Sequence, residues 1–395
     1  MALAPARRAL IQPFHVMEIV AAAAEQELAT GDVLHLEVGQ PSSGAPLGAV
    51  AAAIGLLESG APLGYTPACG IDPLRRRIAR MYHDRHGVEV PPDQVIVTAG
   101  ASGAVVLALL ACFDPGARIV VTEPGYPCYR QMIGALDLEA VPVRIGPDDG
   151  FLLTPAALDE CLATGPIDGV VVASPANPTG TVYDTQRLDG LRAWCAEHGV
   201  RLVADEIYHG ITYGSTAPTA VAGGAAAGEV VIGSFSKYFS MTGWRLGWMI
   251  VPPELVEPVD RLSQNLYLSP PTLAQHAALA AFDDLAELDG HVERYAANRA
   301  ALLDALERMG VTELAPCDGA FYLYGNVARW GIDSRELVDQ WLHELGVATA
   351  PGVDFDPVDG HRWIRWSFAG STADVVEAGR RLVEWGERIG DGSGA

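Results

Sequence analysis

The chain has 395 residues, of which 49% are hydrophobic, and its 49 acidic and 26 basic side chains give a formal charge of −23. This length suffices for two domains, or for one large domain with a smaller companion. The negative charge argues against a nucleic-acid partner, because nucleic acid favours basic surfaces, but a few buried arginines could still bind a small anion.

Neither the cysteines nor the apolar runs indicate a secreted or membrane protein. Six cysteines are widely spread without a Cys-x-x-Cys pair, so we expect reduced thiols and no metal site. Residues 103–113 form an apolar run of 11 residues, which is too short to span a bilayer. Arg7 and Arg8 are followed too soon by Glu18 to begin a signal peptide. We therefore expect a cytoplasmic protein with no membrane partner.

The first 45 residues contain no hydrophobic core of their own, and we expect them to pack against the C-terminal part of the chain. From residue 46 to residue 290, short β-branched runs alternate with helical patterns. The expected strands are centred on residues 95–97, 119–121, 170–172, 202–204 and 230–232, and the expected helices include 103–112 and 188–198. This alternation is typical of a large α/β domain with a mostly parallel sheet and helices on both faces.

The pattern changes near residue 290. A long helical stretch over residues 291–309 precedes two aromatic-rich strands, at 321–324 and 363–366. We expect residues 291–395 to form a smaller α+β domain, with the N-terminal segment packed on it.

Ligands of open α/β sheets bind beyond the carboxyl ends of the strands, and four segments of this chain end such strands. Residues 98–103 open a helix with small side chains, which would let an anion approach free N–H groups; an ordinary strand-to-helix turn explains them equally. Residues 174–180 form a rigid Pro-rich turn that presents the amide of Asn177, although a plain Asn-Pro turn is the alternative.

Asp205 follows the strand at 202–204. A carboxylate at the end of a buried strand is costly without a positive partner, and a protonated pyridine nitrogen would be one. The alternative is that Asp205 caps a helix.

The fourth segment carries the only lysine of the chain, Lys237, since the other 25 basic residues are arginine. Arginine cannot become a neutral amine near neutral pH, so the single lysine indicates a need for a primary amine, as in imine formation with a carbonyl. Ser234, Ser236 and Arg245 lie close by in sequence and could bind a phosphate.

The runs Ser-Pro-Ala-Asn-Pro-Thr-Gly at 174–180, Asp-Glu-Ile-Tyr at 205–208, Ser-Phe-Ser-Lys at 234–237 and Gly-Trp-Arg-Leu-Gly-Trp at 243–248 carry a specific resemblance. The chain resembles the class I/II aminotransferases of pyridoxal-phosphate (PLP) fold type I, and is most similar to the bacterial aspartate-aminotransferase-like subgroup. The resemblance extends to residues 38–41 and 365–369, and so covers nearly the whole chain.

This resemblance implies a PLP cofactor and a role for each matching residue. Lys237 would carry the cofactor as an imine and later move the proton between the substrate and the cofactor. Asp205 would pair with the pyridinium nitrogen, Asn177 and Tyr208 would hydrogen-bond the phenolic oxygen, and Tyr126 would stack on the ring. The phosphate would be bound by the turn and serine residues Gly100, Ala101, Ser102, Ser234 and Ser236, by Arg245, and by Tyr65 of a neighbouring subunit in a homodimer.

The same resemblance places the substrate α-carboxylate on Arg365, the backbone of Gly39 and Asn177. A structural ion pair is the alternative for Arg365, and Arg362 is expected to be a solvated charge at the strand end.

The substrate side chain is less well defined. A dicarboxylate would need a second cation, but residues 105–110 offer none and residues 12–17 offer only His15. Asn265 and Tyr267 are polar without charge. The sequence therefore favours a neutral aliphatic or aromatic amino acid, with pyruvate or 2-oxoglutarate as acceptor in ping-pong kinetics. Aspartate, bound through His15 or an unplaced arginine, is the alternative; a C–S β-lyase is a weaker one, because such enzymes usually carry His where this chain has Ala176.

Overall fold

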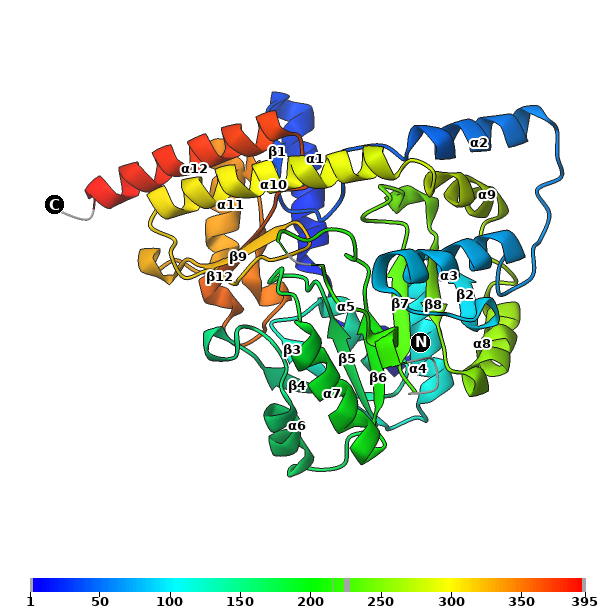
Figure 1. Cartoon of the computed structure of the whole chain (residues 1–395). Helices are drawn as coiled ribbons and strands as arrows, with labels where there is room; N and C mark the ends of the chain where they lie inside the picture. The colour runs from blue at the N-terminus through cyan, green and yellow to red at the C-terminus, as the bar shows by residue number, and fades with distance from the viewer. Residues whose placement is uncertain (1–2, 215, 224–227, 393–395) are drawn as a thin grey trace.

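The computed structural model describes residues 3–214, 216–223 and 228–392 (Figure 1). Its largest element is a seven-stranded sheet with the order β2-β8-β7-β6-β5-β3-β4. The strands from β7 to β4 are parallel, while β8 runs antiparallel to both β2 and β7. Their bounds are β2 Val95–Thr98, β3 Arg118–Glu123, β4 Glu139–Arg144, β5 Gly169–Ala173, β6 Arg201–Asp205, β7 Val230–Ser234 and β8 Gly247–Ile250.

Alternate residues of each central strand point into two different hydrophobic cores. On β5 and β6, Val170 and Leu202 belong to one core while Val171 and Val203 belong to the other. Because both faces are covered, the strands are apolar throughout instead of alternating with polar residues. The predicted α/β class with a mostly parallel sheet is therefore confirmed.

Helices on the two faces come from different parts of the chain. The second core includes side chains of α4 (Gly100–Cys112), α5 (Pro127–Ala135) and α8 (Pro253–Leu266). The first core includes side chains of α3 (Asp72–His86), α6 (Pro155–Leu162), α7 (Thr185–His198) and α9 (Thr272–Ala281). The helix predicted at 103–112 begins earlier, at Gly100, so its first turn lies directly at the end of β2.

The C-terminal part contains a three-stranded antiparallel sheet, β11-β12-β9, packed among long helices. Its elements are α10 Leu285–Arg308, β9 Tyr322–Asn326, α11 Ser334–Leu345, β10 Val347–Ala348, β11 Ala350–Pro351, β12 Trp363–Ser367 and α12 Thr372–Gly392. Short 3₁₀ helices lie at Arg7–Ala9, Pro92–Gln94, Pro147–Asp149, Ala220–Gly223, Thr242–Trp244, Ala328–Trp330, Gly352–Asp354 and Gly360–Arg362.

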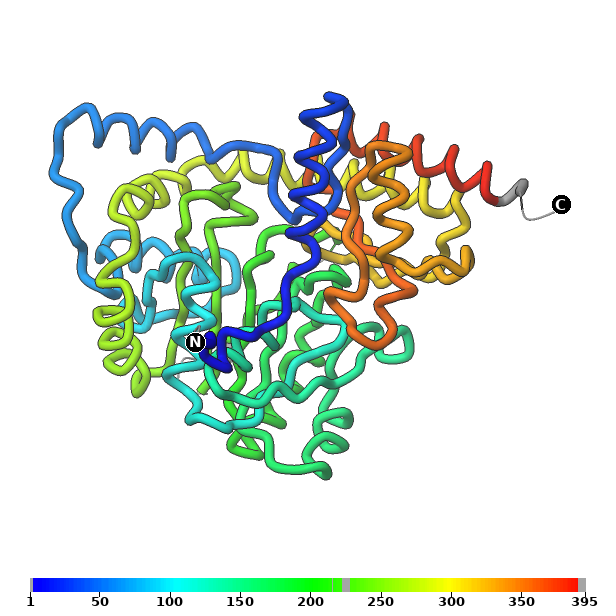
Figure 2. The backbone as a smooth tube through the Cα atoms, turned by 180° about the vertical axis from the view of Figure 1, so that it is seen from behind, coloured from blue at the N-terminus to red at the C-terminus, as the bar shows by residue number. Residues whose placement is uncertain are grey.

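The N-terminal segment joins this C-terminal part. Its strand β1 (Leu34–His35) pairs with β10, and helix α1 (His15–Thr30) lies beside α11 (Figure 2). Helix α2 (Leu47–Glu58) instead extends over α9, away from α1, in both views. The expected domain boundary between residues 290 and 291 falls inside α10, and the division into domains stays a prediction.

No helix within the described residues combines the length and the apolar character that crossing a bilayer requires.

Candidate active site

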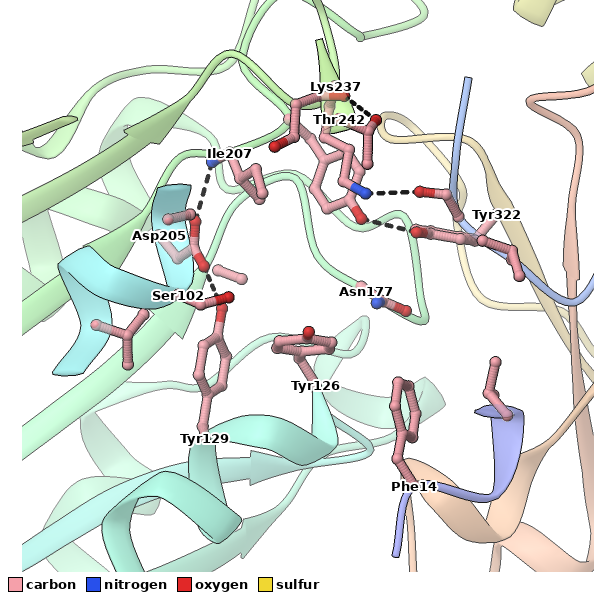
Figure 3. A pocket seen from close by; sticks show the side chains of 18 of the residues that line it. Phe14, Ser102, Tyr126, Tyr129, Asn177, Asp205, Ile207, Lys237, Thr242 and Tyr322 are labelled. Atoms are coloured by element: carbon pink, nitrogen blue, oxygen red, sulfur yellow. Dashed lines mark hydrogen bonds between the residues drawn. The ribbon is translucent and has the colours of Figure 1, made fainter. Parts of the chain in front are cut away.

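A pocket lies where the carboxyl ends of β5, β6 and β7 face α1 and the C-terminal sheet (Figure 3). Side chains from distant parts of the chain line it. They are Phe14, Val16, Met17, Val38, Gly39, Ala101, Ser102, Val105, Tyr126, Tyr129, Met132, Ala173, Asn177, Asp205, Ile207, Tyr208, Ser236, Lys237, Thr242, Arg245, Tyr322 and Arg365.

One end of the pocket is suited to an anion. Gly100 begins α4 with a φ of +76°, and a Cβ built on it would lie 2.7 Å from Nη2 of Arg245. Glycine suits this position because its φ lies in the left-handed region, and a Cβ here would crowd the guanidinium beside the helix start. Arg245 donates to the carbonyl of Thr242 at 3.1 Å and forms no ion pair among the described residues. Helix dipole and guanidinium together favour a phosphate here.

The two serines beside the lysine have different positions. Ser236 lines the pocket, whereas Ser234 does not, and the hydroxyl of Ser234 accepts a hydrogen bond from the N–H of Ser236 at 3.0 Å. Ser234 thus orients the loop that carries Ser236 and Lys237.

Asp205 ends β6 and is only 4% exposed. Its Oδ2 accepts a hydrogen bond from the hydroxyl of Tyr129 at 2.6 Å, and its Oδ1 accepts one from the N–H of Ile207 at 3.0 Å (Figure 3). Burial raises the pKa of Asp205, while these two hydrogen bonds and the charge of Lys237 oppose the rise. A buried carboxylate of this kind is suited to a cationic ring nitrogen.

Lys237 reaches into the pocket from the loop after β7, and its Nζ donates to the carbonyl oxygen of Gly39 at 2.6 Å. Burial, together with the positive charges of Arg365 and Arg245, lowers the pKa of Lys237 to about 8, against the effect of Asp205. At pH 7 roughly one amine in ten is then neutral, far more than for an exposed lysine. The lysine can therefore act as a nucleophile or a base near neutral pH.

The hydroxyls of two tyrosines lie close together between the large sheet and the C-terminal sheet. The hydroxyl of Tyr208, after β6, lies 2.7 Å from the hydroxyl of Tyr322 on β9. A Cβ on Gly39 would lie 1.6 Å from the Tyr322 oxygen, so the tyrosine fills the space that the glycine leaves. Asn177 lines the same wall and accepts from Nη1 of Arg365 at 3.0 Å.

Arg365 lies on β12 and is 2% exposed. Its Nη2 donates to the carbonyl of Glu37, and its guanidinium lies 4.5 Å from the centre of the Tyr322 ring and 4.7 Å from that of Phe355. No carboxylate pairs with it among the described residues, and its buried Nε has no hydrogen-bond partner. Such a cation is available for a ligand carboxylate. Arg362, by contrast, is exposed and binds Asp359 at 2.6 Å.

The remaining wall is apolar. Phe14, Val16 and Met17 from α1 and its preceding residue face Val105 of α4 and Met132 of α5. His15 points elsewhere, since its Nδ1 lies 3.0 Å from Glu18 and it does not line the pocket. Nor do Asn265 and Tyr267. Among the described residues, the only cations at the pocket are Lys237, Arg245 and Arg365.

The structure thus brings most of the predicted site residues to one pocket and leaves three outside its lining. Gly100 and Ser234 are buried but do not line it, and Tyr65 is 83% exposed and does not line it either. Tyr129 and Tyr322 were missed. The sequence contains a pattern for each. Tyr129 follows Tyr126 by one helical turn. Tyr322 and Tyr324 alternate on the strand that pairs with the strand of Arg365.

Comparison with known proteins agrees with this arrangement. A family model described as "Aminotransferase class I and II" matches residues 31–382. The chain is 47% identical to the valine–pyruvate aminotransferase of Mycobacterium tuberculosis over 382 residues, which cover 96% of this chain and 98% of that protein.

Solved structures are similarly close. An aminotransferase from Mycobacterium tuberculosis gives a TM-score of 0.94 at 46% identity, with 98% of this chain and 100% of that chain covered. An aspartate aminotransferase from Thermus thermophilus, solved with maleate, gives a TM-score of 0.89 at 28% identity, with 97% and 100% covered.

Proposed function

Because the chain belongs to the class I and II aminotransferase family, we propose that it moves the amino group of a small neutral L-amino acid, such as valine or alanine, to pyruvate, with PLP as cofactor. The observation that carries this substrate class is the small number of positively charged side chains at the pocket. Of the three that reach the pocket within the described chain, Arg245 serves the phosphate, Lys237 the chemistry and Arg365 the α-carboxylate, which leaves none for a second carboxylate.

The residues present fit PLP. The start of α4 with Ser236 and Arg245 is suited to its phosphate, and the buried carboxylate of Asp205 is suited to its ring nitrogen. Asn177 and Tyr208 offer hydrogen bonds to its phenolic oxygen, and Tyr126 offers an aromatic face. When bound, PLP supplies an electron sink that accepts the pair left on the substrate Cα. The predicted fold type I of PLP enzymes agrees with the solved relatives.

The chain's own groups would perform the other tasks. Arg365, whose Nε is unpaired, would bind the α-carboxylate and so orient the Cα–H bond. The neutral amine of Lys237 would then take the proton from the substrate Cα and, once protonated, would hold it in the pocket as a general acid. The apolar side chains of α1 would keep water away from this exchange.

Both substrates of an aminotransferase must use one pocket in turn. Valine and pyruvate each have a single carboxylate, so Arg365 suffices for both, and the wall of Phe14, Met17 and Val105 suits a methyl or isopropyl group. Aspartate and 2-oxoglutarate would leave a second carboxylate against apolar side chains. The name of the mycobacterial relative supports the same pair of substrates.

We also propose that the enzyme is a homodimer. Leu47, Ile54 and Leu57 of α2 are exposed, and Leu63 and Tyr65 follow them on the same extended segment. Exposed apolar side chains that lie close together are typical of an interface. A partner subunit would cover this segment, and Tyr65 would complete the partner's phosphate site. Light scattering on the holoenzyme tests the assembly.

The test of the substrate class is a panel of amino acids given to the PLP-loaded enzyme without an acceptor. Valine and alanine should discharge the visible absorbance of the bound cofactor, and pyruvate should restore it. Aspartate and glutamate should react at least about 100-fold more slowly, which corresponds to roughly 3 kcal/mol for an unpaired buried carboxylate. Discharge by aspartate and glutamate alone would refute the proposal. Release of a thiol from a thioether amino acid would indicate a lyase instead.

A further inference from the structure

We propose that Asp354 is a positioning residue for the substrate pocket: its carboxylate caps helix α1 and so fixes the apolar wall that this helix presents. Which substrate side chain contacts this wall rests on the proposed function. The capping of α1 by Asp354 does not depend on it.

Helix α1 lacks a cap of its own. The residue at its N-cap position is Phe14, whose side chain cannot accept a hydrogen bond. The first N–H groups of a helix need acceptors, and Ser, Thr, Asp or Asn usually supplies them locally. Here the N–H of His15 donates to Oδ1 of Asp354 at 2.9 Å, and the N–H of Val16 donates to Oδ2 at 2.8 Å. The cap thus comes from more than 300 residues later in the chain.

The capped turn is also the pocket wall. Phe14, Val16 and Met17 line the cavity, and they lie before, within and directly after the two amides that Asp354 holds. Figure 3 shows Phe14 beside Tyr126, and the two rings meet edge to face at 6.4 Å between centroids. A shift of the first turn of α1 would therefore move the wall relative to the pocket.

Asp354 is held firmly enough to act as a reference point. It is 2% exposed, and its carbonyl accepts a hydrogen bond from Nη2 of Arg130 on α5. Arg130 in turn lies 3.5 Å from Glu123 at the end of β3. Helix α5 also carries Met132, on the other side of the pocket. Asp354 therefore links the first turn of α1 to α5, both of which contribute apolar side chains to the pocket lining, and this link would set the width of the space between them.

The same loop supplies a matched control. Asp356 is equally buried, at 2% exposure, but its carboxylate binds Arg144 at 2.9 and 3.1 Å and the N–H groups of Val358 and Asp359. Its carboxylate makes no hydrogen bond to α1, and it does not line the pocket. Asp356→Asn therefore removes a buried carboxylate from the same loop, but it should leave the apolar wall formed by the first turn of α1 unchanged.

The direct test is amide hydrogen exchange of the first turn of α1, followed by mass spectrometry on peptides that cover residues 13–20. Asp354→Asn and Asp354→Ala should exchange faster there than the wild type, both with and without PLP, whereas Asp356→Asn should not. Unchanged exchange in the Asp354 variants would overturn the proposal. This readout requires no turnover, so it separates the capping from the proposed substrate class.

The functional test is the ratio of kcat/KM for valine to that for alanine. Valine has two more carbons than alanine, and each buried carbon contributes about a factor of four, so loss of the wall should lower this ratio by about 15-fold. Asp354→Ala should show this loss, Asp354→Asn a smaller one because it keeps one acceptor oxygen, and Asp356→Asn none. An equal loss for both amino acids, or an equal change in Asp356→Asn, would contradict a positioning role.

A double variant removes the remaining ambiguity. If Asp354 acts through the wall, Asp354→Asn should lower the valine-to-alanine ratio much less in a Phe14→Ala background than in the wild type. If the effects of the two substitutions on this ratio were fully additive, the proposal would be overturned. Should Asp354→Ala fail to fold, Asp354→Asn and this double variant still decide the matter. If the wild type uses neither amino acid, the proposed function fails while the exchange experiment continues to test the cap.

Discussion

Replacement of Arg365 by glutamine is the sharpest test of how this pocket binds a substrate. The guanidinium is 2% exposed, makes no ion pair within the described chain and keeps its Nε unpaired. Arg362, three residues earlier, is the natural control, since it is a 47% exposed arginine directly before the same strand and already binds Asp359. Both variants lose one positive charge, but only one of the two charges faces the pocket.

The expected magnitude follows from the hydrogen bonds that the substrate loses. A carboxylate on a guanidinium fork takes two charge-assisted hydrogen bonds of about 1.5–3 kcal/mol each, and glutamine can replace one of them only in part. A net loss of about 3–4 kcal/mol corresponds to a fall in kcat/KM of about 10²- to 10³-fold. Because the α-carboxylate is common to all substrates, valine and alanine should lose activity equally. Arg362→Gln should stay within about twofold of the wild type, as expected for an exposed charge.

A second consequence concerns Lys237. The charge of Arg365 is, after burial, the largest cause of the lowered pKa of this lysine, which lies at about 8. Without that charge the pKa should rise, so the neutral amine should appear at higher pH. The rate at which PLP loads onto the apoenzyme should level off near pH 8 in the wild type and above it in Arg365→Gln. Equal kinetic losses in the Arg362 and Arg365 variants, or an unmoved loading profile, would refute this reasoning.

Three other substitutions test the cofactor site. Gly100→Ala, at a φ of +76° and with its Cβ against a guanidinium, should weaken PLP binding at least about 10-fold in equilibrium titration, whereas Gly103→Ala, whose Cβ would meet no atom closer than 3.6 Å, should not. Lys237→Ala should still bind PLP but should carry no covalently attached cofactor after borohydride treatment, and a labelled peptide from that variant would contradict the assignment. Tyr129→Phe removes a hydrogen bond that lowers the pKa of Asp205, so kcat should fall about 10-fold, and fall further as the pH decreases, because the carboxylate then gains a proton more readily. A kcat that is independent of pH in that variant would count against the role of Asp205.

The polar half of the pocket could be predicted because it is encoded locally. Asn177, Asp205 and Lys237 each follow a short buried strand, and parallel strands bring their carboxyl ends to one edge of the sheet. Once the strands are recognised from their β-branched runs, the convergence of these residues follows without knowledge of the loops. The lack of a further cation at the pocket, which holds for the described residues, was indicated only in part, because the sequence left His15 or an unplaced arginine open as a second cation.

The apolar half could be predicted only in part, because contacts between distant segments fix it. The mostly apolar character of residues 13–17 is visible in the sequence, but neither the position of that segment nor the partner of His15 is. The pairs Tyr129–Asp205 and Tyr208–Tyr322 join residues 76 and 114 positions apart, and no periodicity links such positions. The role expected for Tyr65 depends on a second chain, so the exposed position of this side chain in one chain leaves it a prediction.

The start of α1 shows why such contacts escape local rules. A reader of the sequence looks for Ser, Thr, Asp or Asn immediately before a helix, and Phe14 offers none, so helix α1 appears poorly defined at its first residue. The structure resolves this by a carboxylate from the other end of the chain, which can cap the helix only after the C-terminal sheet has formed beside it. Helix α1 therefore depends on tertiary structure for its first turn. It follows that the selectivity of the pocket, which this turn determines, should be more sensitive to substitution of Asp354 than to conservative changes within α1 itself.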